Sequence, residues 1–403
     1  MSTQPKTIDD INRTKTVVDG TERMPGRDSS GDFKITIADL VSSLQSSYVG
    51  AIDLNVFSRI RKNGSSNEIL VPPFRTILDG EEYFTIAEKT LSVADLDTGS
   101  AFTFGADHYI WAGVPASGKT PVLKISLSAT NPIGLTTPKI IGGFHYGKIR
   151  NSITISDVSD GIVPNSCWDL KHMPKCYLLG LADPLNYQLG GMVEVISGSL
   201  WVDIYLASNG GGSGFNKKAF SKINQIPLTG TEGLCWFDFA IRAKNVGKRL
   251  LTYQEWTQAA IGSPQGLNDS NLHGWTKTSN TGRVKTAATN AADADANYIL
   301  GYNTSLLNVR DCVGNLWEWL ADMSNRHDLT TSWAFQNVLD AGELSSDTDF
   351  GQAYLPNSVG MVAWIAGGLW AVGVVAGARA VNVDNCPWNV RTIIGCRFAC
   401  ESL

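Results

Sequence analysis

The chain has 403 residues, a net charge of −5 at pH 7, 43% hydrophobic residues and 18% charged residues. A chain of this length seldom folds around one core, so we expect two or three domains. The weakly acidic balance provides no electrostatic footprint for nucleic acid. No segment approaches the roughly 18 consecutive apolar residues of a membrane span, so we expect no membrane insertion. The many glycines and tryptophans favour β-structure with long loops.

Residues 1–49 are expected to form a small β-rich oligomerisation module. Short β-like pieces surround the turn DSSGDF, and Ile37, Leu40 and Val41 have the spacing of one face of a helix. A unit this small is not stable alone, so we expect it to gain stability by trimerising. The stretch MSTQPKTIDDINRTK lacks the apolar core of a secretory signal, which predicts assembly in the cytoplasm.

Residues 50–165 are interpreted as a β-sandwich domain. Segments such as AIDLNVFSRI, EYFTIAEKTLSV and PVLKISL have strand-like composition, and the turn clusters KNGSSN and DLDTGS separate them. Short strands that alternate with turn clusters are typical of all-β sandwiches.

One segment of this domain, Gly113–Thr120 (GVPASGKT), satisfies the glycine-rich pattern of a phosphate-binding loop. Such a loop needs a helix that opens at its lysine, because helix N–H groups bind the phosphates. Pro121 and the β-branched residues after it indicate a strand instead. We therefore interpret the segment as a hairpin turn and not as the site of a nucleotide hydrolase.

The composition becomes mixed from residue 166 onward, which predicts an α+β domain over residues 166–403. Thr252 and Glu255 form a capping box ahead of a short helix that Gly262 ends. Residues 208–214 and 263–297 are rich in Gly, Ser, Asn and Ala and are predicted to be loops. Long irregular loops on a compact scaffold often carry function.

The segment that starts at Gly367 interleaves two kinds of residue. One kind resembles a fixed frame: Gly367, Gly368, Trp370, Gly377, Arg379, Gly395, Arg397 and Cys400. The residues between them are chemically arbitrary and show neither strand alternation nor a solid apolar run. We expect Arg379 and Arg397 to anchor the frame by hydrogen bonds. The arbitrary residues either form buried strands at AVGVV and TII or face solvent, where their apolar members would mark an interaction surface.

Four motifs carry a resemblance to a known family. They are GNLWEW (Gly314–Trp319), GGLW (Gly367–Trp370), GAR (Gly377–Arg379) and GCRFAC (Gly395–Cys400). In this order they resemble the formylglycine-generating-enzyme branch of the C-type lectin fold. More narrowly, the chain resembles the variable proteins of diversity-generating retroelements that bacteriophages carry. Segments 141–148, 167–174, 190–206 and 247–262 extend this resemblance upstream in the same order.

The resemblance implies a C-type lectin fold for residues 166–403, with a variable ligand-binding surface over residues 367–394. It also implies host recognition by a homotrimer in a virion tail fibre or tail tip. The implied partners are a bacterial cell-surface receptor, either protein or glycan, and other tail proteins. In such systems a reverse transcriptase errs at adenines, and asparagine codons drift to many residue types. The implied surface residues are Leu369, Ala371, Val372, Val374, Val375, Asn382, Asp384, Asn385, Trp388, Asn389, Arg391, Ile393 and Ile394.

The same resemblance implies a calcium site beside the GNLWEW motif. Its ligands would be the side chains of Asp311 and Glu318 and the carbonyl groups of Gly314 and Leu316. Hard oxygen donors from a tight loop suit Ca²⁺. The alternative is that both carboxylates only tie the loop together through hydrogen bonds. Apart from this calcium, no cofactor is expected.

An enzymatic function is the least favoured interpretation. The resembling enzyme depends on a cysteine pair between its glycine turn and the following arginine, and residues 368–379 contain no cysteine. The five histidines are scattered without the spacing of a metal site or catalytic dyad, so we expect no catalytic residue. A cellular variable protein with another ligand remains the second alternative. Seven cysteines, an odd number, imply no full disulfide framework, and pairing of Cys396 with Cys400 is left open.

Overall fold

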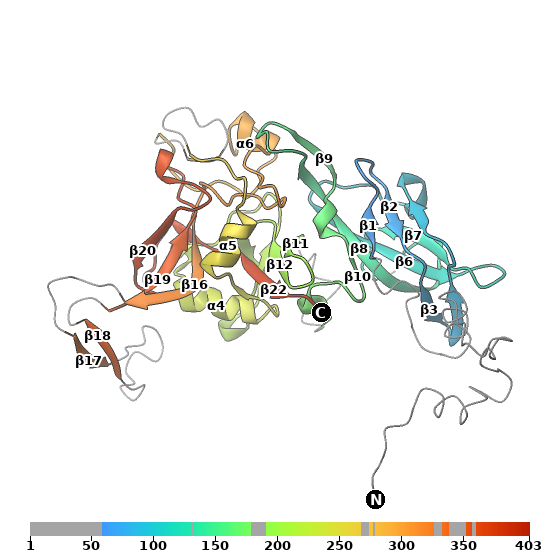
Figure 1. Ribbon diagram of the computed structural model, residues 1–403, viewed down its shortest axis with the longest axis horizontal. Helices are drawn as coiled ribbons and strands as arrows, with labels where there is room; N and C mark the ends of the chain where they lie inside the picture. Colours follow the sequence, from blue (N-terminus) through green and yellow to red (C-terminus); the bar gives the residue numbers. More distant parts are fainter. Residues whose placement is uncertain are drawn as a thin grey trace, which may run out of the picture.

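The computed structural model describes residues 59–130, 132–178, 191–266, 274–276, 279–325, 333–337, 352–356 and 360–403. The N-terminal module expected over residues 1–49 lies outside these residues. Figure 1 shows two bodies along the longest axis, an all-β body and a mixed body that contains the C-terminal end. Within the described residues, no helix is long and apolar enough to cross a membrane.

The first body consists mainly of strands and contains no α-helix within its described residues. Its strands are β1 (Arg61–Lys62), β2 (Ile69–Val71), β3 (Arg75–Leu78), β4 (Glu81–Phe84), β5 (Lys89–Leu91), β6 (Ala106–Val114), β7 (Val122–Ser126), β8 (Thr136–Arg150), β9 (Val158–Ile162) and β10 (Trp168–Asp169). The sheet β10-β8-β6-β7, with β9 also on β8, shares a core with the smaller sheet β1-β2-β5. Ile69, Ile110 and Ile125 are completely buried in that core. The predicted all-β character is confirmed; the domain boundaries stay predictions.

Strand β10 approaches β8 closely enough to require glycine there. Trp168 pairs with Gly143, and Asp169 pairs with Gly142. A Cβ atom on Gly142 would lie 2.4 Å from the Trp168 carbonyl oxygen, and one on Gly143 would lie 2.7 Å from the Trp168 ring. The pair of glycines therefore leaves room for β10 to pair closely with β8.

The segment Gly113–Thr120 is a hairpin turn, as predicted. It joins β6 to the antiparallel strand β7, and no helix follows Lys119. The ammonium group of Lys119 lies 2.8 Å from the Glu81 carboxylate, and both side chains are exposed. The turn therefore lacks the helix N-terminus that a phosphate-binding loop needs.

The second body contains two four-stranded sheets and the helices. The first sheet has the order β11 (Met192–Ile196), β12 (Leu200–Asp203), β22 (Phe398–Glu401), β15 (Arg249–Leu250). The second has the order β20 (Val381–Asn385), β19 (Met361–Ala366), β16 (Trp317–Asn325), β21 (Ile394–Gly395). The two-stranded pairs are β13 (Ala207–Asn209) with β14 (Ala219–Ser221) and β17 (Trp333–Asn337) with β18 (Gln352–Pro356). The last strand, β22, therefore lies inside its sheet and not at an edge.

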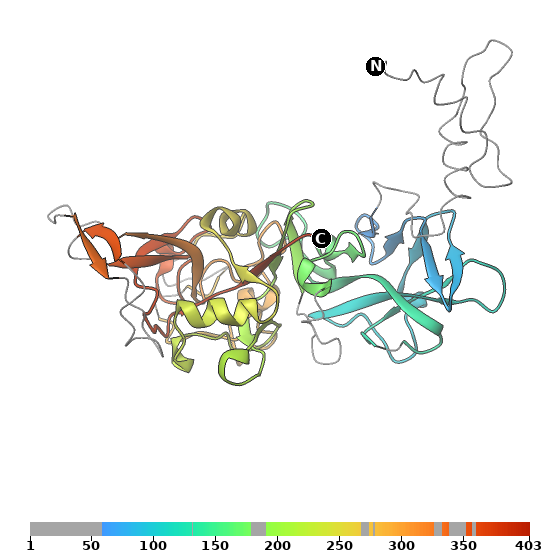
Figure 2. The ribbon, with the colours of Figure 1, turned by 90° about the horizontal axis from the view of Figure 1, so that it is seen from below.

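The helices are short: α3 (Lys175–Leu178), α4 (Trp236–Lys244), α5 (Tyr253–Ala259) and α6 (Ala296–Leu300). Helix α5 begins at the predicted capping box: the Glu255 N–H donates to the Thr252 hydroxyl and the Thr252 N–H donates to the Glu255 carboxylate. Trp256 on its inner face is completely buried in the core between the sheets. Figure 2 shows α4 and α5 in the second body, away from the all-β body.

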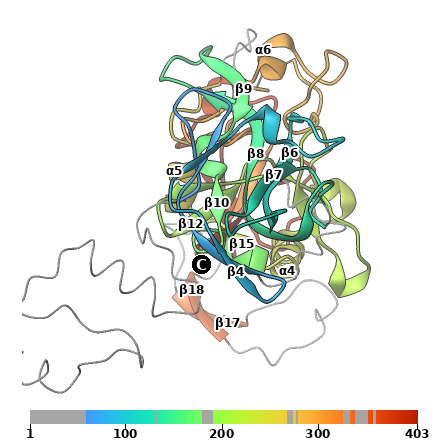
Figure 3. The same ribbon diagram turned by 90° about the vertical axis from the view of Figure 1, so that its right-hand side faces the viewer.

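A buried polar contact joins the two bodies, which lie one behind the other in Figure 3. The imidazole of His145 on β8 lies 2.7 Å from the Asp107 carboxylate and 2.9 Å from the Tyr205 hydroxyl. At the end of β8, the Arg150 N–H donates to the Asn308 side chain and its guanidinium donates to the Thr304 carbonyl. Strand β8 therefore belongs to the first sheet and also hydrogen-bonds to the second body.

We expect Glu255→Gln to lower the free energy of unfolding by about 1 kcal/mol at pH 7, because it removes the charge that pairs with Arg249 while glutamine keeps the capping hydrogen bond. Burial raises the pKa of Glu255, but hydrogen bonds from Arg249 and Thr252 outweigh it, so the pKa lies below its ordinary 4.5. The stabilisation is then present above pH 4.5 and is lost as the pH falls through the folded value. Urea titrations should show that the free energies of unfolding of the wild type and the variant become equal at acidic pH. The exposed substitution Gln254→Ala should give a difference that is independent of pH.

All seven cysteines are free, and six of them are buried. Cys400 accepts a hydrogen bond from the Cys176 N–H at 3.1 Å, so the alternative of a Cys396–Cys400 disulfide is not realised. We expect thiol titration of the unfolded, unreduced protein to count seven thiols. Only the half-buried Cys386 should react quickly in the folded protein. A count of five would contradict this structure.

Candidate receptor-binding surface

The site rests on a buried ion pair between the GNLWEW motif and the last strand. The guanidinium of Arg397 donates to both carboxylate oxygens of Glu318, with Nε–Oε2 at 2.6 Å and Nη2–Oε1 at 2.9 Å. Its remaining nitrogen donates to the carbonyl groups of Asp203 and Ile204. Both charged side chains are at most 1% exposed. Burial raises the pKa of Glu318, and the Arg397 guanidinium opposes this shift. Arg397 therefore anchors the frame as predicted.

A second buried pair lies beside the first. The ammonium of Lys248 is 2.5 Å from the Asp203 carboxylate, and neither side chain is more than 2% exposed. The other Asp203 oxygen accepts from the Phe398 N–H at 3.3 Å. Strand β22 is thus held by charged groups at two successive residues, Arg397 and Phe398.

Asn315 of the same motif connects two loops. Its side-chain amide exchanges hydrogen bonds with the backbone of Val284, at 3.0 and 3.2 Å. Its carbonyl accepts from the Trp370 N–H at 3.1 Å. Asn315 has a φ of 59°, in the left-handed region, which lets its backbone and side chain face both loops. The motif therefore ties the start of the C-terminal segment at Trp370 to the loop that contains Val284.

The turn after Trp370 is held by backbone contacts. Gly373 N–H donates to the Thr276 carbonyl, and Gly266 N–H donates to the Ala376 carbonyl, each at 2.9 Å. The Gln265 amide donates to the Val374 carbonyl at 2.8 Å. These bonds use backbone groups of the turn and none of its side chains. Side chains can therefore change here at little cost in stability, as exposed substitutions usually do.

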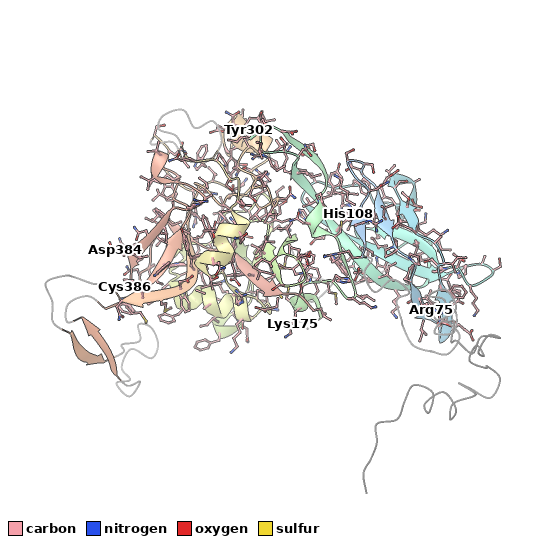
Figure 4. All side chains as sticks on the ribbon, viewed as in Figure 1. Arg75, His108, Lys175, Tyr302, Asp384 and Cys386 are labelled. Carbon is pink, nitrogen blue, oxygen red and sulfur yellow. The ribbon has the colours of Figure 1, made fainter. Side chains whose placement is uncertain are left out.

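We call residues 369–393 the tail surface. Val374, Val375, Asp384 and Arg391 are exposed, and Figure 4 labels Asp384 on β20. The predicted residues that are half-buried are Leu369, Ala371, Val372, Asn382, Asn385, Trp388, Asn389 and Ile393. Of these, Leu369 and Ile393 pack against the core. Some side chains of the tail surface are thus exposed to solvent, and others pack against the core.

Two predictions about single residues are wrong. Ile394 is 1% exposed and pairs with Trp317 in β21, so it is a core residue and not part of the tail surface. Arg379 does not anchor the frame through its side chain, which is exposed; its carbonyl instead accepts from the Tyr253 hydroxyl at 2.9 Å.

Three exposed valines were missed: Val381, Val383 and Val390, at 39%, 43% and 52% exposure. Val381 and Val383 alternate with polar residues in β20, the edge strand of its sheet. That alternation was the signal in the sequence, because side chains two apart in a strand share a face. The apolar part of the tail surface is therefore larger than predicted.

The four residues proposed for calcium do not fit the ion. Both oxygens of Glu318 are occupied by Arg397, whose positive charge would repel a cation. Asp311 accepts from the Thr286 hydroxyl, the Ala287 N–H and the Asn303 amide. In the parts of the chain that the structure describes, no three acidic, histidine or cysteine residues gather as a metal site. The geometry supports the alternative, in which both carboxylates tie loops together.

Two of the buried thiols, Cys312 and Cys396, are poor candidates for catalysis. Burial raises the pKa of Cys312 to about 12 and that of Cys396 well above its ordinary value. A thiol must ionise to act as a nucleophile. The Asp107–His145–Tyr205 contact is buried between the two bodies, and burial raises the pKa of Tyr205. Its geometry suits a structural contact, because a substrate has no access to it.

Two family models match the chain: one described as Mtd second domain over residues 73–169, and one described as sulfatase-modifying factor enzyme 1-like domain over residues 198–401, half of the chain. The tail fiber receptor-binding protein of Bordetella phage BPP-1 is 25% identical over 319 residues, which cover 75% of this chain and 73% of that protein.

Solved structures give the same picture of the fold. Those titled Major Tropism Determinant M1 Variant and I1 Variant each match with 21% identity and a TM-score of 0.60. The matches cover 93% of this chain and 89% and 90% of those chains, respectively. The predicted fold class is confirmed: mainly β, with an α+β C-terminal domain of the C-type lectin fold. The predicted resemblance is confirmed as well.

We expect Glu318→Gln to lower the free energy of unfolding by about 3–5 kcal/mol, because it leaves the Arg397 guanidinium buried without its counter-ion. The double variant Glu318→Leu with Arg397→Met should recover a large part of that loss. Chemical denaturation measures both. Lys119→Met, which breaks the exposed pair with Glu81, is the control and should leave stability nearly unchanged. A single variant as stable as the wild type would contradict the anchoring role.

Proposed function

Given that the chain belongs to the family with a sulfatase-modifying factor enzyme 1-like domain, we propose that this domain is the host-binding head of a phage receptor-binding protein. The observation that carries the proposal is the tail surface. Its backbone is fixed by Asn315, Thr276 and Gln265, while its side chains include five exposed valines. An exposed apolar patch on a rigid frame is typical of an interaction surface.

The relatives support a role in host recognition. One is described as a phage tail fiber receptor-binding protein, and the structural matches are titled as variants of a tropism determinant. The matches cover most of the length of the phage protein and of the solved structures. These relatives support our proposal that the chain is part of a virion tail fibre or tail tip and binds a bacterial surface molecule.

We further propose that a diversity-generating retroelement varies the tail surface. The exposed or half-exposed residues there mix Val, Ala, Ile, Asp and Arg with Asn382, Asn385 and Asn389. Errors at adenine-rich asparagine codons would produce such a mixture. Trimerisation through the N-terminal module would multiply a weak single-site affinity through avidity.

We also propose that the domain acts by binding a ligand and not by catalysing a reaction. Residues 368–379 contain no cysteine, and burial raises the pKa of the Cys312 and Cys396 thiols. A turnover assay with a cysteine-containing peptide tests the enzymatic alternative. A cellular variable protein would share the fold and differ in location, and electron microscopy of labelled virions distinguishes it.

Sequencing the DNA downstream of this gene tests the diversification. We expect a near-copy of the last part of the gene that differs from it mainly where the copy has adenine. Codons for Val374, Val375, Asp384 and Arg391 should differ, and the codon for Arg397 should not. A constant tail without such a copy among isolates would contradict the retroelement.

Binding of the labelled protein to a panel of bacterial isolates tests host recognition. We expect Val375→Glu to weaken binding to the bound strains about tenfold or more, because it places a charge in the apolar interface. Val93→Glu changes an exposed valine of the first body and should bind as the wild type does. Equal binding by both variants would show that the tail surface is not the contact.

A further inference from the structure

We infer that the tail surface binds a protein receptor through an acidic side chain, which inserts its carboxylate beside Arg379. The inference rests on the proposed function and names its partner more closely. The contact site is a hollow that we call the Arg379 hollow, lined by Ser263, Gln265 and residues 374–380. It is a shallow depression, largely open to solvent, with a volume of about 360 Å³.

The Arg379 hollow is preformed by the backbone. The Gly266 N–H donates to the Ala376 carbonyl, and the Gly377 N–H donates to the Gly367 carbonyl at 3.0 Å. Gly367 must be glycine, because its φ is +95° and a Cβ atom would lie 2.4 Å from the Cys312 carbonyl oxygen. The Tyr253 hydroxyl fixes the carbonyl of Arg379. A ligand therefore meets a wall that is already in place, which lowers the cost of binding.

The lining is apolar with one positive charge. Besides Arg379, the segment contributes Val374, Val375, three alanines and a glycine. No acidic residue lines the hollow. Gln265 already donates its amide to the Val374 carbonyl, so Arg379 is the charged donor that a ligand would meet there.

This chemistry fits an acidic side chain better than a sugar. The methylene stem of a glutamate would lie against the valines, and its carboxylate would accept two parallel hydrogen bonds from the guanidinium. A sugar would need several donors and acceptors for its hydroxyl groups, and the apolar lining offers few. A protein segment with an exposed Glu or Asp therefore suits the hollow.

The arrangement also separates a constant contact from variable ones. Arg379 and Gln265 lie outside the residues assigned to diversification, whereas Val374 and Val375 belong to them. The carboxylate contact would persist while the neighbouring side chains change which receptor fits. The variable side chains at the rim of the hollow would then determine which receptor binds. Arg379 would contribute the same part of the affinity for every receptor.

Small-molecule probes test the site on the full chain. We expect pentanoate to bind with a dissociation constant of about millimolar order, as a ligand of its size permits. Pentanamide, which has the same shape without the charge, should bind at least tenfold more weakly. Arg379→Gln should abolish the preference for pentanoate. Arg61→Gln, which removes a half-exposed arginine of the first body, should keep it. NMR titration measures all four.

Three outcomes of the titration would overturn the inference. They are equal binding of the acid and the amide, no saturable binding of pentanoate, and an unchanged preference in Arg379→Gln. Tighter binding of glucuronate than of pentanoate would point to an acidic glycan and would overturn the protein receptor.

Cell binding separates this inference from the proposed function. Arg379→Gln should bind host cells at least tenfold more weakly than the wild type, and protease treatment of the cells should remove binding. If Arg379→Gln binds as well as the wild type while Val375→Glu does not, the acidic contact is wrong and receptor binding stands. If the wild type binds no isolate, the proposed function itself fails, whereas the pentanoate titration still decides the chemistry of the hollow.

Discussion

Two charged groups without access to water, the Glu318 carboxylate and the Arg397 guanidinium, join strand β16 to the approach of strand β22. Each alone would be a costly buried charge, so only a chain that brings both together is stable. Arg397 also reaches the carbonyl groups that end β12, which connects three strands of two sheets at one point. The position of the tail surface follows from this contact, because the surface is the chain between the two strands.

In the turn after Trp370, the backbone is bound to the rest of the domain, whereas the side chains form the tail surface. Asn315, Thr276 and Gln265 hold the turn after Trp370 through its backbone, and the side chains of Val374 and Val375 are left in solvent. Variation of those side chains therefore does not remove a bond that the fold needs. The buried pairs differ in this respect, because loss of either partner would leave a buried charge without its counter-ion.

Local features of the sequence predicted local structure well. The α5 capping box, the hairpin at Gly113–Thr120 and the all-β character of the first body all rest on neighbours a few residues apart. Contacts between distant residues could not be predicted in this way. Glu318 and Arg397 are 79 positions apart, so the sequence alone did not reveal that the arginine occupies the carboxylate expected to bind calcium. Ile394 looked variable because an isolated apolar residue does not show whether it faces the core.

The place of β22 in its sheet has a consequence for how such a chain could evolve. Trp201 and Arg249 pair with this last strand from both sides, so residues 398–401 complete a sheet that begins some 200 positions earlier. A mutation in residues 369–393 that introduces a stop codon or shifts the reading frame would remove this strand. The truncated product would lose its domain, and not only its specificity. A chain that folds into this domain has therefore been translated through residues 369–393 to its last strand.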